Sequence, residues 1–161
     1  MKLPDVNVLI FAANKASVEH EQARTWLESA FDEPGGVGLA WVALLGFVRL
    51  ATRRGIFSKP LSVEDALSVL RAWLAEPRAS VLHPTERHAQ ILARLLVAVG
   101  SGGNLTTDGH LAALAIEHGA TLGSFDRDFE RFSGLAFEAL GDARYAIQVR
   151  PRPPHSSRSS C

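Results

Sequence analysis

Four aspartates occupy positions where their carboxylates could act together on a substrate. Asp5 follows the first apolar residues, Asp108 precedes the apolar run LAALAI, and Asp126 and Asp128 follow ATLGS. Strand carboxyl ends and helix amino ends face one edge of a doubly wound sheet, so we expect the four to converge. Converging carboxylates repel one another unless a cation lies between them, and Mg²⁺ and Mn²⁺ prefer oxygen ligands. Such an ion activates water and neutralises a phosphodiester transition state, so the pattern indicates phosphodiester hydrolysis.

Helix capping is a competing interpretation of the same residues. Asp108 could be a plain N-cap for LAALAI, and Asp126 and Asp128 could cap the short helix DRDFERF. Asp5 is harder to explain in this way, because a carboxylate beside a buried apolar run costs free energy unless it is paired or metal-bound. On spacing alone, both interpretations stay open.

Short strands alternate with amphipathic helices along the chain. This order predicts βαβ units with right-handed crossovers and a mainly parallel sheet covered on both faces. The strands are expected at residues 1–4, 37–39, 79–82, 120–124 and 135–138. Helices are expected at 7–14, 40–52 and 85–99, and a short helical turn at 126–132. Two more helices are expected to begin after N-caps at Ser17 and Ser62, and another is expected to run from Asp108 to a stop at Gly119.

Length and composition exclude several classes of protein. The 161 residues fit one domain, and a hydrophobic fraction of 47% is enough to bury a core. The longest stretch without a charged residue, residues 34–48, is well short of the ~20 apolar residues of a membrane span, so no membrane partner is expected. Cys161 is the sole cysteine, which excludes an internal disulfide and a Cys-based zinc site. With no secretory signal at MKLPDVNV, we expect a cytoplasmic protein.

The charges divide the chain into two parts. Residues 142–161 hold Arg144, Arg150, Arg152 and Arg158 against Asp142, a net charge of +3. Residues 1–141 hold 13 basic and 16 acidic residues, which leaves a net charge of −3. We expect one folded domain over 1–141 and a flexible tail rich in Arg, Pro and Ser over 142–161. The tail arginines could add salt-sensitive affinity for RNA or simply keep the chain soluble.

Two segments carry a family resemblance. LPDVNVLIFAA and TTDGHLAALAIEHGATLGSFDRDFERF, in this order, resemble the PIN domain, and most closely the VapC toxin ribonucleases of bacterial toxin–antitoxin pairs. The resemblance covers about residues 1–140. It implies a three-layer α/β/α fold with a five-stranded parallel sheet, and Mg²⁺- or Mn²⁺-dependent endoribonuclease activity. It also implies a homodimer and inhibition by a cognate VapB-like antitoxin.

The resemblance assigns roles to six residues. Asp5, Asp108 and Asp126 match the catalytic, metal-binding aspartates, with Asp5 and Asp108 holding the ion and Asp126 completing its shell or orienting water. The matching supporting positions are Asn7, Ser124 and Asp128.

One position departs from the family pattern. The helix after the second strand usually carries a glutamate, but AWVALLGFVRLAT has no acid, and alignment on Arg49 places Gly46 there. Three readings follow: a working three-aspartate site, a site completed by Asp128, or a catalytically weakened domain that binds RNA or a partner. We favour the first two together. Candidate RNA contacts are Arg49, Arg53 and Arg54, although each could equally be a solvated or paired surface residue.

Overall fold

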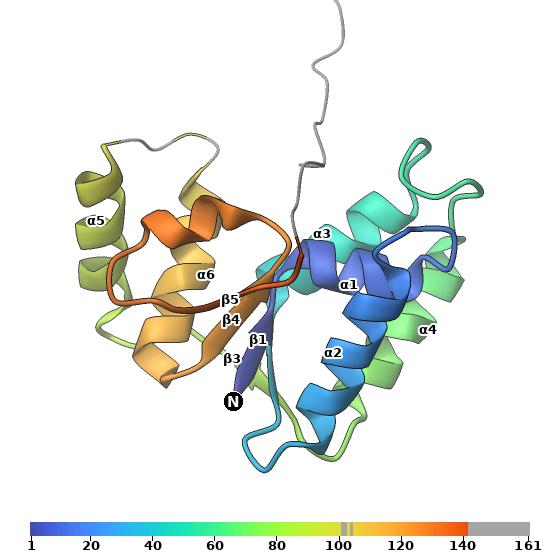
Figure 1. Cartoon of the computed structure of the whole chain (residues 1–161), viewed down its shortest axis with the longest axis horizontal. Helices are drawn as coiled ribbons and strands as arrows, with labels where there is room; N and C mark the ends of the chain where they lie inside the picture. The colour runs from blue at the N-terminus through green and yellow to red at the C-terminus, as the bar shows by residue number, and fades with distance from the viewer. Residues whose placement is uncertain (101–102, 104, 142–161) are drawn as a thin grey trace, which may run out of the picture.

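Five parallel strands form the centre of the molecule. The computed structural model describes residues 1–100, 103 and 105–141, and its sheet has the order β3-β2-β1-β4-β5 (Figure 1). The strands are β1 (Lys2–Pro4), β2 (Val37–Ala40), β3 (Ala79–Leu82), β4 (Thr121–Ser124) and β5 (Ala136–Ala139). The expected positions of all five strands are confirmed to within one residue.

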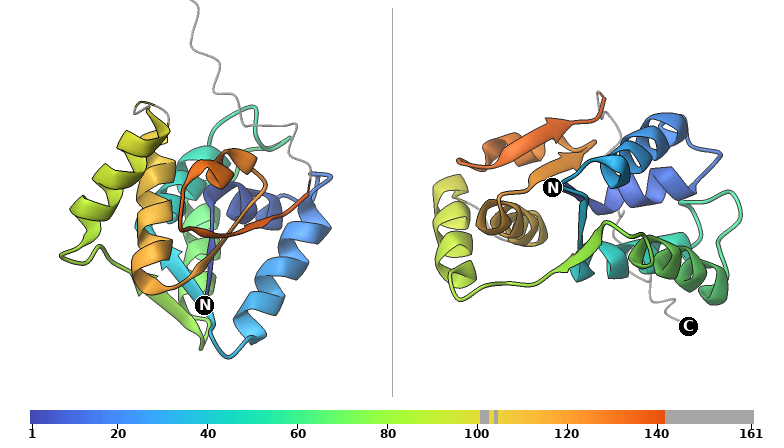
Figure 2. Two further views of the ribbon diagram at one scale, coloured as in Figure 1. Left: turned by 60° about the vertical axis from the view of Figure 1, so that its left-hand side comes forward. Right: turned by 90° about the horizontal axis from the view of Figure 1, so that it is seen from below.

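Helices cover both faces of this sheet. The helices are α1 (Val6–Ala13), α2 (His20–Asp32), α3 (Trp41–Ala51), α4 (Val63–Leu74), α5 (His88–Val99) and α6 (Leu105–His118), with a 3₁₀ helix η1 (Arg127–Arg131). In Figure 2, α1 to α4 lie on one side of the sheet and α5 with α6 on the other. Two main apolar clusters follow this division, one around Phe47 beneath α1 to α4 and one around Leu114 beneath α5 and α6. The predicted three-layer α/β/α fold is therefore confirmed.

The register of the central strands brings distant residues together. β1 lies between β2 and β4, and Pro4 at the end of β1 is paired with Gly123 in β4. Asp5 follows Pro4 in the chain, and Ser124 follows Gly123. The Asp5 N–H donates to the Gly123 carbonyl at 3.0 Å. The carboxyl edge of the sheet thus places two predicted site residues next to each other.

Three expected helix starts were wrong. α2 begins at His20 rather than just after Ser17, whose hydroxyl bonds instead to the Glu19 carboxylate. α5 begins at His88, because Thr85 donates to a glutamate on α6. α6 begins at Leu105, so Asp108 lies inside its first turn and is not its N-cap. Burial of the Leu105 side chain explains the earlier start, since it gives the helix an apolar anchor one turn before Asp108.

Two other helix boundaries were confirmed. The Ser62 hydroxyl accepts a hydrogen bond from the Asp65 N–H at 3.0 Å, as the capping arrangement predicts. α6 stops at Gly119, whose φ of 61° is the left-handed conformation that ends many helices.

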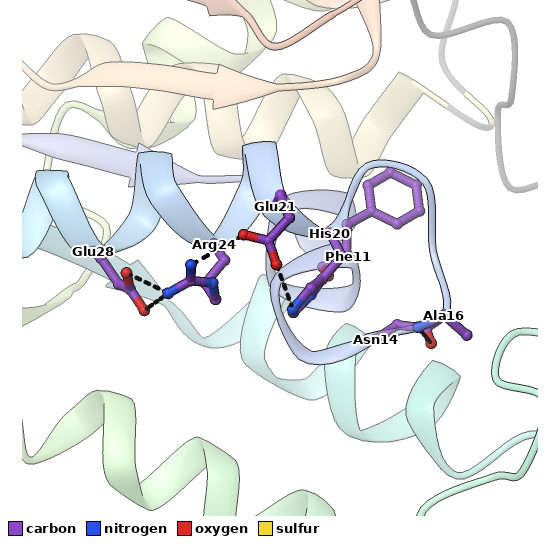
Figure 3. A network of polar contacts seen from close by, with 7 residues as sticks. All are labelled: Phe11, Asn14, Ala16, His20, Glu21, Arg24 and Glu28. Atoms are coloured by element: carbon purple, nitrogen blue, oxygen red, sulfur yellow. Dashed lines mark hydrogen bonds and ion pairs between the residues drawn. The ribbon is translucent and has the colours of Figure 1, made fainter.

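Polar contacts tie α1 to α2 (Figure 3). A ring nitrogen of His20 lies 2.9 Å from the Phe11 carbonyl at the end of α1, and Glu21 lies beside the same ring. Arg24 bridges Glu21 and Glu28 along α2. On the sheet side, Phe11 packs edge-on against Phe125, with ring centroids 5.1 Å apart. These contacts fix the direction of α1, which begins at Asp5.

The expected division into a domain over 1–141 and a tail over 142–161 is not tested by the structure, because residues 142–161 lie outside the described part. Within the described part, no helix is long and apolar enough to cross a membrane.

Candidate active site

Asp5 is held at the junction of β1 and α1. Its Oδ1 accepts a hydrogen bond from the Val6 N–H at 2.6 Å, and its Oδ2 accepts one from the Ser124 hydroxyl at 2.8 Å. The residue is only 5% exposed and caps the amino end of α1, where the helix dipole favours an anion. The carboxylate is therefore fixed in place before any ligand arrives.

Ser124 is the centre of the polar network at this edge. The residue is fully buried, and its Oγ accepts hydrogen bonds from the Asn7 side-chain amide at 2.8 Å and from the Asp126 N–H at 2.9 Å. The Asn7 Oδ1 in turn accepts from the Phe125 N–H at 3.2 Å. Asn7 and Ser124 were predicted to be supporting residues, and the structure brings both into contact with the predicted site.

Asp126 and Asp128 lie on the segment that follows β4. The Asp126 Oδ1 accepts from the Asp128 N–H at 2.9 Å, so Asp126 does cap η1, as the capping interpretation allowed. The Asp128 side chain is half-exposed and lies 3.4 Å from the Arg131 guanidinium. Capping uses one oxygen of Asp126 and does not conflict with a second role for the other.

Asp108 differs from the other three in its contacts. Among the described residues it forms no hydrogen bond or ion pair, although it is half-buried in the first turn of α6. Burial, together with the charges of Asp5, Asp126 and Asp128, raises the pKa of Asp108 from 3.8 to about 7. The charges of the other three carboxylates thus act on Asp108, and burial of Asp108 adds to their effect.

Asp5 is shifted in the same direction for related reasons. Burial raises its pKa from 3.8 to about 6 against the opposing hydrogen bonds of Ser124 and Val6, and the charge of Asp126 adds to the rise. No lysine or arginine of the described residues is among the groups that shift Asp5 or Asp108. Arg131 lies beside Asp128, but no lysine or arginine of the described residues is paired with Asp5 or Asp108.

The side chains fit a hard dication that keeps much of its own water. Across the described residues, no three metal-ligating side chains stand close enough to hold an ion by themselves. Mg²⁺ is commonly bound through one or two carboxylates, with water filling the remaining positions. The Asp108 carboxylate has no partner among the described residues and feels the charge of the fixed Asp5 carboxylate, so the two could supply one or two oxygen ligands to such an ion.

The position of the expected family glutamate is closely packed. Gly46 lies on α3 against Val6, and a Cβ at position 46 would stand 2.9 Å from the Val6 Cγ2. Unbonded carbons do not approach so closely, so a side chain here requires Val6 to move. Gly46, which stands where the family resemblance places a glutamate, thus lets α3 pack closely against the start of α1.

In the described part of the chain, no hydrogen bond or ion pair joins the three predicted arginines to the four aspartates. Arg49 is exposed on α3, and Arg53 and Arg54 are exposed in the loop that follows it. Their contact with RNA stays a prediction.

A second polar cluster was not predicted. His88 on α5 lies 2.7 Å from Glu117 and 2.8 Å from His110, both on α6. Thr85 donates to the same Glu117 at 2.7 Å, and the Glu117 side chain is only 1% exposed. No spacing motif links these residues in the sequence. The cluster fastens α5 to α6, the helix that carries Asp108.

Comparisons with known proteins agree with the fold. The PIN domain family model matches residues 2–135. Ribonuclease VapC37 of Mycobacterium tuberculosis is 50% identical over 138 residues, which cover 86% of this chain and 96% of that protein.

Two solved structures show the same fold at low sequence identity. VapBC2 from Rickettsia felis, bound to a DNA fragment from its promoter, matches with a TM-score of 0.65 at 19% identity, over 87% of this chain and 98% of that chain. VapC20 of Mycobacterium tuberculosis, described as a sarcin-ricin loop cleaving toxin, matches with a TM-score of 0.63 at 19% identity, over 84% of this chain and 98% of that chain.

Proposed function

Because this chain belongs to the PIN domain family and, within it, to the VapC ribonucleases, we propose that it is the toxin of a toxin–antitoxin pair. It cleaves RNA phosphodiester bonds with a divalent ion, Mg²⁺ or Mn²⁺, at Asp5, Asp108 and Asp126. One observation carries the metal assignment: Asp108 is half-buried, has no partner among the described residues, and faces the charges of three other carboxylates.

Each aspartate has a distinct task in this proposal. Asp5 provides a fixed carboxylate, because Val6 and Ser124 hold both of its oxygens. Asp108 provides a carboxylate that ionises near neutral pH, and this ionisation makes ion binding depend on pH. Asp126 is held by its cap to η1 and orients the attacking water through its second oxygen. A bound ion supplies stabilisation of the charge that develops on the phosphate.

Substitution of Asp108 is the cleanest test. Asp108→Asn removes the charge and no hydrogen bond to a described residue, whereas an amide at position 5 would disturb the bond that Ser124 donates. We expect Asp108→Asn to lower the rate of RNA cleavage by more than about 100-fold while thermal unfolding still shows a folded protein. The control is Asp65→Asn, an exposed aspartate of α4, which should cleave at the parental rate.

A cleavage rate for Asp108→Asn equal to the parental rate would remove the metal assignment.

A second candidate function rests on Gly46, because α3 carries no acid at the position where the family resemblance places one. In that case the chain is a PIN domain that binds RNA or a partner without cutting. The cleavage assay separates the nuclease from the binding domain. A binding domain would hold RNA but leave it intact at every Mg²⁺ and Mn²⁺ concentration.

The partners in this proposal are an RNA substrate, a VapB-like antitoxin and a second copy of the chain, all in the cytoplasm. Support for the antitoxin comes from the VapBC complexes among the structures that share the fold. The test is expression in bacteria of the chain alone and together with the product of a short reading frame directly upstream. We expect the chain alone to stop growth and co-expression to restore it. Growth that is unaffected by the chain alone would contradict a toxin.

A further inference from the structure

We propose that His88 and Glu117 are positioning residues, which hold Asp108 at the carboxylate site by fixing α6 against α5. The inference rests on the proposed function, because it takes Asp108 as a ligand of the ion. It starts from a contrast between two aspartates. Asp5 is fixed by hydrogen bonds to its own carboxylate, whereas Asp108 receives none from the described residues. The place of the Asp108 carboxylate therefore depends on the helix that carries it.

A chain of hydrogen bonds joins α6 to the start of α5. The Glu117 Oε2 accepts from the Thr85 hydroxyl at 2.7 Å and from the Thr85 N–H at 3.3 Å, and its Oε1 lies 2.7 Å from the His88 Nδ1. Burial alone would raise the pKa of Glu117, but the bonds from Thr85 and His88 lower it below 4.5. An ionised carboxylate only accepts, so the His88 Nδ1–H donates to Glu117. In neutral His88 the other nitrogen, Nε2, then accepts from the His110 Nδ1–H at 2.8 Å.

This chain holds α6 at two points on one side of the helix. His110 and Glu117 are about two helical turns apart, so both face α5. Asp108 precedes His110 by two residues, which places it about 160° around the helix axis, on the side turned away from α5. A rotation of α6 by about 10° would move a carboxylate roughly 5 Å from the axis by roughly 1 Å. A displacement of that size at a reacting group can lower a rate about 100-fold.

An apolar contact brings α5 close to the residue next to Asp108. A Cβ on Gly109 would stand 2.9 Å from the Leu96 Cδ2 and 3.3 Å from the Leu92 Cδ1, both on α5. Apolar contacts hold the two helices together but have no preferred direction, whereas hydrogen bonds weaken steeply when they are misaligned. The polar chain therefore supplies the part of the fastening that fixes the rotation of α6.

Stability alone is a weak reason for a polar chain between two helices. Hydrogen bonds at such a place largely replace bonds to water, and well-packed apolar side chains of similar volume often stabilise a protein as much or more. Leucines at positions 88 and 117 would thus keep α5 on α6 but would not fix the angle between them. The polar chain fits a positioning role better than a purely stabilising one.

The test compares variants of the full chain that break or keep these hydrogen bonds. The breaking variant combines His88→Leu with Glu117→Leu, which removes both polar groups together and leaves neither without its partner. The conserving variant is Glu117→Gln, because its amide oxygen accepts from Thr85 while its NH₂ group donates to the other tautomer of His88. Ser62→Ala is the control for a general loss of stability, since it removes the N-cap of α4 on the opposite side of the sheet (Figure 2).

The first measurement is Mn²⁺ binding, followed by the electron paramagnetic resonance of the free ion, which needs neither RNA nor cleavage. We expect the breaking variant to bind Mn²⁺ about 10-fold more weakly than the parental chain, and Glu117→Gln and Ser62→Ala to bind it as the parental chain does. The breaking variant is also combined with Asp108→Asn. If the polar chain acts through Asp108, it should cause no further loss there. An equal loss with and without Asp108, or no loss in either, would overturn the proposal.

The second measurement is amide hydrogen exchange of the metal-free protein, which depends on no ligand. We expect the amides of residues 109–112, next to Asp108, to exchange faster in the breaking variant, while those of α4 keep their parental rates. Ser62→Ala should show the reverse pattern. Parental exchange rates at residues 109–112 in the breaking variant would show that the polar chain does not hold this end of α6, and would overturn the proposal.

Failure of the positioning role and failure of the proposed function give different results. If the parental chain cleaves RNA but the breaking variant binds Mn²⁺ and exchanges its amides as the parental chain does, the positioning proposal fails and the function stands. If the parental chain binds no Mn²⁺, the metal assignment fails, and the exchange of residues 109–112 alone decides whether His88 and Glu117 hold this end of α6.

Discussion

Two aspartates at the carboxyl edge are more costly to ionise than an ordinary surface acid. Asp5 is buried but receives hydrogen bonds from Val6 and Ser124, which recover part of that cost. Asp108 receives none from the described residues and faces three other carboxylates. A group that the fold holds in such surroundings is a candidate for function, because a bound cation relieves the same repulsion that destabilises the metal-free protein.

Burial of Asp5 and Asp108, together with this repulsion, predicts how stability depends on pH when metal is absent. The pKa values of Asp5 and Asp108 rise from 3.8 to about 6 and about 7 on folding, so the folded state binds these protons more tightly than the unfolded state. The associated stability is complete below pH 4 and is lost as the pH rises through 6 and 7. We expect urea unfolding in the presence of a chelator to give a lower free energy of unfolding at pH 8 than at pH 5.

Asp108→Asn should remove much of this dependence. Without the carboxylate, we expect the metal-free protein to gain about 1–2 kcal/mol at pH 8, a figure reduced for the partial exposure of Asp108. The gain should vanish near pH 4, where the parental Asp108 is already protonated in the folded state. Asp65→Asn serves as the control, because its carboxylate is exposed on α4. A parental protein that is as stable at pH 8 as at pH 5 would show that neither burial nor mutual repulsion raises the pKa values of these carboxylates.

Sequence patterns predicted the strands better than the helix starts. Residues 79–82 were expected to be a strand, and β3 has the same bounds, because a short apolar run after a proline and before a turn has few alternatives. The start of α6 was misplaced because Asp108 has the chemistry of an N-cap. In the folded protein, burial of Leu105 extends the helix by one turn, and no local pattern reveals that burial.

Features that depend on contacts between distant elements could be predicted only in part. The carboxyl ends of β1 and β4 were expected to bring Asp5 near Asp126, and the Ser124 network does so. The raised pKa values, in contrast, depend on how deeply each acid is buried. The cluster of His88, His110 and Glu117 joins residues that lie 22 and 29 positions apart, so only the packing of α5 on α6 reveals it.

At the scale of the whole molecule, one face of α3 is exposed in the described part of the chain. Trp41 is 44% exposed and Leu45 is 61% exposed, and the two lie one turn apart on the same side of the helix. Isolated exposed apolar residues are common on soluble proteins, but a large aromatic and a leucine side by side form an apolar patch. A homodimer of the kind proposed would bury this patch, Trp41 and Leu45, if α3 forms its interface.

The patch predicts how a single charge alters self-association. In a dimer that buries Leu45, the change Leu45→Lys places two ammonium groups in an apolar interface, where neither finds a partner of opposite charge. Sedimentation velocity of the parental chain should therefore show a dimer, and Leu45→Lys should sediment as a monomer. Its unfolding midpoint should change little, because an exposed position contributes within about 0.5 kcal/mol to folding. Val97→Lys is the matched control, since Val97 is 80% exposed on α5, away from α3, and its dimer should persist. A Leu45→Lys protein that remains dimeric would place the interface on another surface, and a monomeric parental chain would remove the homodimer itself.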